Sequence, residues 1–377
     1  MTDRTVLCVI GTRPEAIKMA PVVGALRRVP DLRVRVLLTA QHRSLLDQAL
    51  AVFDIRADTD FDIMRPNQTL SGLTIRVLRA LDPLLKRHPP ALVLAQGDTT
   101  TVMATAIACF HRHVPFGHVE AGLRTGNLHY PFPEEFNRIV ASRVAVLNFA
   151  PTEGARQALL REAVSDATIH VTGNTVIDAL LDVASRNTGE LVPLPPGGRL
   201  ILLTMHRREN FGAPAAAVLA AVRDLCATFP ELRVVYPVHP NPNIHNAAHR
   251  ALGSHPQVHL TKPLDYPRLV AAMRQATIVL TDSGGLQEEA PALGKPVLVL
   301  RDETERPEAV SLGVAKLIGT DHARVVAEVT RLLTDATAYA EMARGVSPYG
   351  DGHAAERIAM HIASFLATGG NRASERR

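Results

Sequence analysis

Short apolar runs rich in β-branched residues alternate with amphipathic segments along almost the whole chain. In the first half we predict strands at residues 6–10, 34–39, 91–95, 116–119 and 169–171, with helices between them that include 14–28, 69–88 and 99–111. This alternation is typical of parallel sheets that helices cover on both faces. The pattern therefore predicts an α/β fold.

A segment rich in proline and glycine, residues 191–199, interrupts the alternation and is typical of a linker. The pattern then resumes, with strands predicted at 200–204, 234–236, 258–260, 278–281, 297–300 and 314–318. A chain of 377 residues is usually too long to fold around a single hydrophobic core. We therefore expect two Rossmann-like doubly wound domains facing a cleft. The expected domains are 1–172 and 173–350, followed by a C-terminal helix with a frayed tail, 351–377, that can cross back to the first domain.

Composition removes several classes of protein from consideration. Hydrophobic residues make up 46% and charged residues 21%, which is ordinary for a globular protein and excludes disorder. No apolar run approaches the ~18 residues of a membrane-spanning helix, and the amino terminus predicts a strand rather than a signal peptide. The three cysteines are far apart without CxxC spacing, so we expect neither disulfides nor a cysteine metal site, and a cytoplasmic location.

The net charge of +4 favours an anionic partner. Basic residues are scattered, aromatic residues make up only 4%, and there is no tryptophan, so the stripe expected of a nucleic-acid surface is missing. A small anionic ligand is the better prediction.

The first strand is followed by Gly11, which permits a sharp turn, and by a helix that opens near Pro14. Free N–H groups at a helix start form a natural anion site, which Arg13 and Lys18 could complete. The alternative is that both are solvated charges on a helix face. A Walker loop is absent.

Three acidic residues, Asp98, Glu120 and Glu134, follow successive elements that would end at one rim of the first sheet. Carboxylates do not usually gather at strand ends, so a site of proton transfer is predicted. For Asp98 alone, an N-cap of the helix opening at Thr99 is the alternative.

In the second half, His206 directly follows a strand, where an imidazole could contact a phosphate or move a proton, although histidines are more often structural. No pair of histidines has convincing zinc spacing. The segment 281–291 places Ser283, Gly284 and Gly285 between a strand and a helix, as expected for a diphosphate loop. Glu288 or Glu289 could then bind a ribose, and a turn without ligand is the alternative.

Together these segments resemble the non-hydrolysing UDP-N-acetylglucosamine 2-epimerases of bacteria. The motifs GTRPEAIKMAP, GDTTT, GHVEAGLRT, HRREN, LTDSGGLQEEAP and SPYGDG occur in family order from Gly11 to Gly352. The resemblance implies the glycosyltransferase-B architecture and the interconversion of UDP-GlcNAc and UDP-ManNAc. It also implies anti elimination of UDP through a 2-acetamidoglucal and re-addition, no metal or other cofactor, and a cytoplasmic homodimer that serves polysaccharide biosynthesis.

The resemblance also assigns roles to matching positions. Proton transfer falls to Asp98, Glu120 and Glu134. Arg13, Lys18 and His206 match residues that bind the substrate and its diphosphate, and Arg13 and His206 would also assist departure of the diphosphate. The phosphate loop, the ribose carboxylate and a further ligand-contacting arginine correspond to Ser283, Gly284, Gly285, Glu289 and Arg306.

Some family members bind a second, activating substrate molecule. Positions matching that site are Gln41, Arg207 and His239, together with Glu134. Ser44 and Asn67 stand where an activated member has glutamine and arginine, so we expect weakened or absent activation.

Two other enzymes and a binding protein are alternatives. A glycosyltransferase on the same fold has no need for three carboxylates at one rim, and a hydrolysing epimerase would release free ManNAc and UDP. A nucleotide-sugar sensor without turnover would not require the carboxylates at all.

Overall fold

The computed structural model describes residues 4–39, 43–65, 67–186, 189 and 191–369. The chain forms two compact units: unit 1 comprises Met1–Ala179 and Tyr349–Arg377, and unit 2 comprises Leu180–Pro348. The divisions therefore follow Ala179 and Pro348, compared with the boundaries at residues 172 and 350 expected from the sequence.

Unit 1 contains a seven-stranded parallel sheet in the order β3-β2-β1-β4-β5-β6-β7. Its strands are β1 (Thr5–Ile10), β2 (Arg33–Leu38), β3 (Thr59–Asp60), β4 (Leu92–Gln96), β5 (Phe116–Val119), β6 (Leu147–Ala150) and β7 (Ile169–Val171). Every residue of the central strands β1, β4 and β5 is buried, as expected where helices cover both faces of a parallel sheet.

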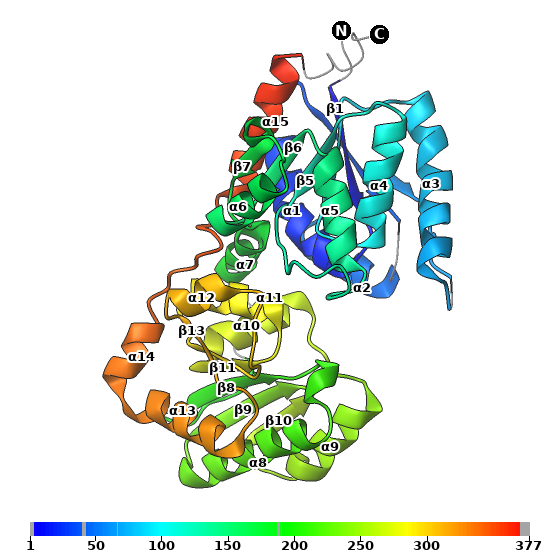
Figure 1. The fold of residues 1–377 in the computed structure, drawn as a ribbon. Coiled ribbons are helices and arrows are strands. Elements are labelled where there is room, and N and C mark those ends of the chain that lie inside the picture. Colours follow the sequence, from blue (N-terminus) through cyan, green and yellow to red (C-terminus); the bar gives the residue numbers. More distant parts are fainter. Residues whose placement is uncertain (1–3, 40–42, 66, 187–188, 190, 370–377) are drawn as a thin grey trace. The chain divides into compact units, whose positions relative to one another are not determined.

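The helices of unit 1 form two layers (Figure 1). One layer contains α3 (Leu70–Arg87), α4 (Thr100–His111) and α5 (Glu134–Val144), and the other α2 (Arg43–Val52), α1 (Arg13–Arg27) and α15 (Ala354–Ala367). Between strands lie α6 (Glu153–Arg161) and η1 (Asp166–Thr168), and α7 (Thr175–Ser185) runs across the division between the units. Threonine side chains accept backbone hydrogen bonds at the starts of α1, α3 and α4, which fixes where these helices begin.

The C-terminal helix belongs to unit 1. Helix α15 packs beside α1, and the buried carboxylate of Asp178 in α7 accepts the N–H groups of Ala354 and Ala355 at 3.3 and 2.8 Å. A side chain from a distant element therefore satisfies two N–H groups at the start of α15.

Unit 2 contains a six-stranded parallel sheet in the order β10-β9-β8-β11-β12-β13. Its strands are β8 (Arg199–Thr204), β9 (Leu232–Pro237), β10 (Val258–Thr261), β11 (Ile278–Thr281), β12 (Val297–Val299) and β13 (Ala315–Leu317). Its other elements are η2 (Arg208–Asn210), α8 (Ala213–Thr228), α9 (Pro242–Leu252), α10 (Tyr266–Gln275), α11 (Gly284–Ala292), α12 (Pro307–Ser311), α13 (His322–Thr334) and α14 (Ala336–Met342).

The predicted α/β class and the two doubly wound sheets are confirmed. Strands β5, β7 and β11 have the predicted bounds, whereas β3 and β6 were not predicted. Among the described helices, none combines the length and the apolar character needed to cross a bilayer.

Each sheet changes its direction of winding once. Unit 1 winds outward from the adjacent strands β1 and β4, and unit 2 from β8 and β11. In doubly wound sheets the carboxyl ends of such strand pairs are the usual place for ligands, because the connecting helices leave on opposite faces there. In each unit, the carboxyl ends of this strand pair position the candidate functional residues.

A substitution at Gly122, two residues after the predicted site residue Glu120, tests how tightly unit 1 packs. Gly122 has a φ of 93°, and a Cβ there would lie 2.3 Å from the carbonyl oxygen of Ala155 in α6. We expect Gly122→Ala to lower the free energy of unfolding by more than ~2 kcal/mol. Gly126, with a φ of 77° and open space where a methyl group would be added, is the matched control, and Gly126→Ala should cost about 1 kcal/mol. Urea unfolding measures both, and equal losses would contradict the proposed clash with α6.

Candidate active site

The turn after β1 is built around a buried carboxylate. Thr12 caps α1, and Gly11 N–H donates to Glu15 Oε2 at 2.6 Å. Burial raises the pKa of Glu15 to about 7, although the Gly11 amide partly opposes this shift. Arg13 is the first residue of α1 and is half-buried, so the predicted helix start and its arginine lie at the β1–β4 edge.

Glu120, directly after β5, is held more firmly than a surface carboxylate. Lys18 Nζ contacts both carboxylate oxygens, at 2.8 and 2.6 Å, and Gln96 Nε2 at the end of β4 donates to Oε2. The side chains of Lys18 and Glu120 are only 15% and 7% exposed. Lys18 is therefore not a solvated charge on a helix face.

The backbone of Glu120 adopts a φ of 64°, in the left-handed region that non-glycine residues rarely occupy. Such strain persists only where the surrounding structure holds it, and it gathers at functional sites. Neither this backbone conformation nor the contact with Gln96 could be predicted from the sequence, because both depend on neighbouring strands.

Asp98, in the loop after β4, forms a second charged network. Arg138 of α5 donates to its carboxylate, and the same arginine contacts Glu135 at 3.3 Å. The residue that caps α4 is Thr99, whose hydroxyl accepts Val102 N–H, so the N-cap alternative for Asp98 is wrong.

Glu134 is the first residue of α5 and is half-buried. Among the described residues it forms no ion pair and joins neither network. Its neighbour Glu135 is instead buried and accepts the N–H groups of Thr125 and Gly126. Of the three predicted carboxylates, two thus lie in ion pairs at adjacent strand ends and the third lies on the following helix.

His118 in β5 connects the loop after β4 with helix α5, and it was not predicted as a site residue. Its Nε2 lies 2.7 Å from the carbonyl oxygen of Gly97, and its Nδ1 lies 3.1 Å from Ser142 Oγ. Burial lowers the pKa of His118 to about 4, so the ring is neutral at neutral pH. A neutral ring with Nε2–H facing the carbonyl fixes the loop that carries Asp98.

In unit 2, His206 follows β8 and meets an acid that sequence reasoning missed. Asp282 directly follows β11 and is fully buried, and its Oδ1 atom lies 2.8 Å from His206 Nδ1. Its carboxylate also accepts the N–H groups of His206 and Arg207 and the Asn210 side chain, at 3.0–3.1 Å. Burial alone would raise the pKa of Asp282, but the bonds and charge of His206 lower it overall.

This pairing orients the imidazole. The His206 side chain is 43% exposed, and its other nitrogen, Nε2, has no hydrogen-bond partner among the described residues. A histidine held by a carboxylate at one nitrogen can act on a ligand with the other. The signal in the sequence was an acid directly after the strand that neighbours β8.

Glu305, a second acid that the sequence did not point to, lies beside this loop and contacts three arginines. Its oxygens lie 2.8 Å from Arg301, 3.7 Å from Arg306 and 3.9 Å from Arg207. Burial would raise the pKa of Glu305, but the hydrogen bond and charge of Arg301, with the charge of Arg207, lower it to about 2. The carboxylate therefore offsets the repulsion between neighbouring guanidinium groups.

The predicted diphosphate loop caps α11. Ser283 precedes the helix without a side-chain capping bond, and a Cβ on Gly284 would lie 3.2 Å from the Arg306 guanidinium. Glu288 binds Arg306 Nε at 2.8 Å, whereas Glu289 accepts the Tyr266 hydroxyl at 2.8 Å. Arg306 therefore lies against Gly284 at the start of the helix.

The residues matched to a second substrate site are only partly described. Arg207 lies in the His206 loop, and the exposed His239 ring is 6.5 Å from the His206 ring, centroid to centroid. Gln41 lies outside the described residues, as does the Ser44 side chain. Within the described part of the chain, no group of three or more histidine, cysteine, aspartate or glutamate side chains could hold a metal ion.

Each of the two units contains a parallel, doubly wound sheet, and charged groups lie where the winding of each sheet changes direction. These features define a protein of the glycosyltransferase-B architecture. A glycotransferase of kitacinnamycin shares this fold, with a TM-score of 0.68 at 13% identity over 97% of this chain and 99% of that one.

Closer similarities identify the family. Residues 24–363 match the sequence model of UDP-N-acetylglucosamine 2-epimerase. The enzyme of that name from Escherichia coli O157:H7 is 51% identical over 94% of this chain and 96% of its own. The crystal structure of UDP-GlcNAc 2-epimerase from Neisseria meningitidis bound to UDP-GlcNAc has a TM-score of 0.89 at 42% identity, covering 96% of this chain and all of that chain. The chain belongs to the UDP-N-acetylglucosamine 2-epimerase family.

The buried carboxyl of Glu15 predicts a pH dependence of stability. Its pKa is about 7 in the folded chain and near 4.5 in the unfolded chain, so the folded state holds the proton up to a higher pH. The stabilisation is complete below pH 4.5 and is lost as the pH rises through 7, by on the order of 1–3 kcal/mol.

Glu15→Gln mimics the protonated acid and should remove this loss. We expect the stability difference between variant and wild type to shift in favour of the variant between pH 4.5 and 8, as measured by urea unfolding. The exposed Glu341→Gln is the matched control and should show no such shift. A Glu15→Gln curve parallel to the wild-type curve would contradict the assignment.

Proposed function

We propose that this protein interconverts UDP-GlcNAc and UDP-ManNAc by inverting C2 without net hydrolysis. The observation that carries the proposal is Glu120, a buried carboxylate on a strained backbone, paired with Lys18 at the ligand-binding edge of unit 1. About 50% identity to curated UDP-N-acetylglucosamine 2-epimerases supports the same reaction.

The chemistry explains why carboxylates and cations are both needed. The C2 hydrogen of the sugar is not acidic, so direct deprotonation is a poor route. In anti elimination a base takes the C2 proton, the C1–O bond breaks, and UDP leaves with the bonding electrons to give 2-acetamidoglucal. UDP then adds back at C1 while a proton returns to the opposite face of C2. The overall reaction is redox-neutral, so it requires no external oxidant or reductant.

Proton removal and return need acid/base groups at different positions. Asp98 and Glu120 follow different strands and are held by different cations, and Glu134 lies on the next helix. We assign proton transfer to these three carboxylates together. An ion-paired carboxylate can accept a proton, and its cation partner keeps it in place through the reaction.

Unit 2 supplies the groups that suit a departing diphosphate. We assign this role to His206 Nε2, Arg306 and the loop of Ser283, Gly284 and Gly285, which presents the start of α11. Preorganised positive groups stabilise charge that develops as the bond breaks. We assign further contacts to the substrate to Arg13 and Lys18 of unit 1.

Ribose recognition is assigned to Glu289, which the Tyr266 hydroxyl orients. We further propose a cytoplasmic homodimer, the state that the family resemblance implies. The three cysteines are free and buried, which supports a reducing compartment.

The reaction itself is tested by incubating the protein with UDP-GlcNAc in deuterium oxide. We expect UDP-ManNAc that carries deuterium at C2, together with C2 exchange in the remaining UDP-GlcNAc, by NMR. Free ManNAc with UDP would instead indicate a hydrolysing epimerase, and no turnover would contradict the proposal.

The carboxylates are tested by isosteric substitution. Asp98→Asn and Glu120→Gln should each lower kcat by about 10²-fold or more, the usual contribution of acid/base catalysis, with UDP affinity nearly unchanged. Asp82→Asn and Glu153→Gln make the same chemical changes in surface ion pairs and should retain wild-type turnover. Near-normal kcat in either site variant would assign that residue a structural role, and calorimetric UDP binding verifies that each variant is folded.

A further inference from the structure

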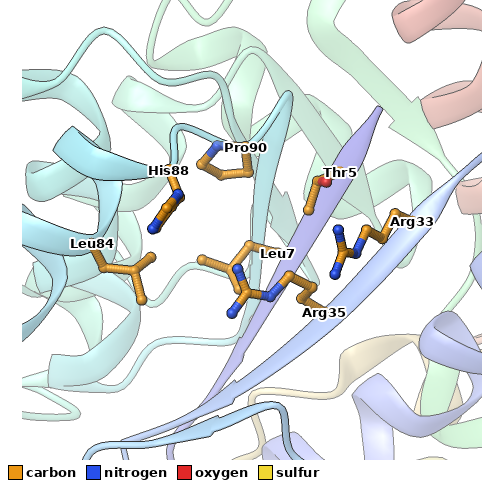
Figure 2. A pocket seen from close by; sticks show the side chains of 7 residues that line it. All are labelled: Thr5, Leu7, Arg33, Arg35, Leu84, His88 and Pro90. Carbon is orange, nitrogen blue, oxygen red and sulfur yellow. The ribbon is translucent and has the colours of Figure 1, made fainter. Parts of the chain in front are cut away.

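A cavity of about 110 Å³ lies in unit 1, away from the candidate active site (Figure 2). It is lined by Thr5, Arg33, Arg35 and His88 together with three apolar residues. The cavity is at the amino ends of β1 and β2, whereas Gly11 and Arg13 follow the carboxyl end of β1. Six residues of strand separate the two places, about 20 Å at ~3.3 Å per residue.

The strand register places the arginines on the helix-covered face of the sheet. Thr5 pairs with Arg33 and Leu7 pairs with Arg35, and alternate residues of a strand share one face. Further along this face, Val9 and Leu37 pack with α3 and α4 in the core. At the end of the core the strand therefore carries two arginines where the pattern would continue with apolar residues.

Positive charge is in excess around this cavity. Helix α3 ends with Lys86 and Arg87, and His88 is its C-cap, so the chain itself already supplies cations to the negative end of the helix dipole. Arg33 and Arg35 add two more charges. Of the acids in the neighbouring segments, Asp82 is bound by Arg112, and Asp58 accepts the N–H group of Val36 at 2.8 Å.

Within the described chain, neither Arg33, Arg35 nor His88 forms an ion pair. Arg35 Nη2 donates to Thr59 Oγ1 at 3.5 Å, a long bond that uses one of five guanidinium donors. Figure 2 shows both arginines on one strand and His88 across the cavity, where α3 ends. Helix-dipole compensation alone does not require this many cations around one hollow.

We propose that this cavity binds the phosphate group of a small ligand, with Arg33 and Arg35 as its main donors. Guanidinium groups match the geometry of phosphate oxygens, and two of them with an imidazole offer more donors than a single carboxylate needs. The volume is several times that of a water molecule but holds no nucleotide. The ligand is therefore inorganic phosphate or the phosphoryl end of a phosphomonoester.

The test measures phosphate binding to the full chain by calorimetry, with saturating UDP present to occupy any nucleotide site and chloride holding the ionic strength constant. We expect inorganic phosphate to bind at one site per chain, and glucose 6-phosphate in a parallel titration separates a free phosphate site from a phosphomonoester site. Saturable binding of either ligand supports the proposal. Failure of both to bind, or equal binding of chloride, overturns it.

Matched variants locate the binding. Arg33→Gln and Arg35→Gln should each weaken phosphate binding by about tenfold or more, since each removes charge-assisted hydrogen bonds. Arg87→Gln removes one positive charge from the end of α3, next to His88, but Arg87 does not line the cavity, so phosphate affinity should stay within about twofold of wild type. Equal weakening in all three variants would show a diffuse charge effect and overturn the proposal. Unchanged UDP affinity and urea unfolding confirm that each variant is intact, independently of whether the epimerase reaction occurs.

Discussion

Parallel pairing of β1 with β4, and of β8 with β11, is the constraint on which the rest of the structure depends. Both strands of each pair point the same way, so the loops that follow them reach one edge of the sheet. The chain leaves these strands for opposite sides of the sheet, which keeps that edge uncovered by crossover helices. Arg13 and Asp98 follow one pair, and His206 and Ser283 follow the other.

At both edges, each buried carboxylate has a side-chain partner that binds it through an ion pair or a hydrogen bond. Lys18 with Glu120, Arg138 with Asp98, and His206 with Asp282 are all partly or wholly removed from water. An isolated charge in such places would be costly, so each group that could do chemistry is also a group that its partner holds in position. The arrangement reduces the reorganisation that a reaction at these atoms would require.

The sequence was sufficient for the class of fold, most strands and the loops that follow them, because hydrophobic periodicity and glycine-rich turns are local signals. It did not show β6, since the largely apolar run 145–150 continues directly from the helical pattern of α5. Asp282 and Glu305 were also missed, because a buried acid next to a strand end looks like any other acid until the neighbouring strand brings His206 or an arginine to it. The strained backbone of Glu120 is likewise set by tertiary contacts rather than by its own residue type.

The return of α15 to unit 1 has a consequence for how the chain is made. Unit 2 is one continuous stretch, so it can fold as soon as it has emerged from the ribosome, whereas unit 1 is assembled from both ends of the sequence. The side of α1 that α15 covers, and the Asp178 carboxylate that binds its first N–H groups, must wait for the last segment to be synthesised. During that interval unit 1 exposes the apolar surface that α15 later covers, so unit 1 reaches its final packing after unit 2.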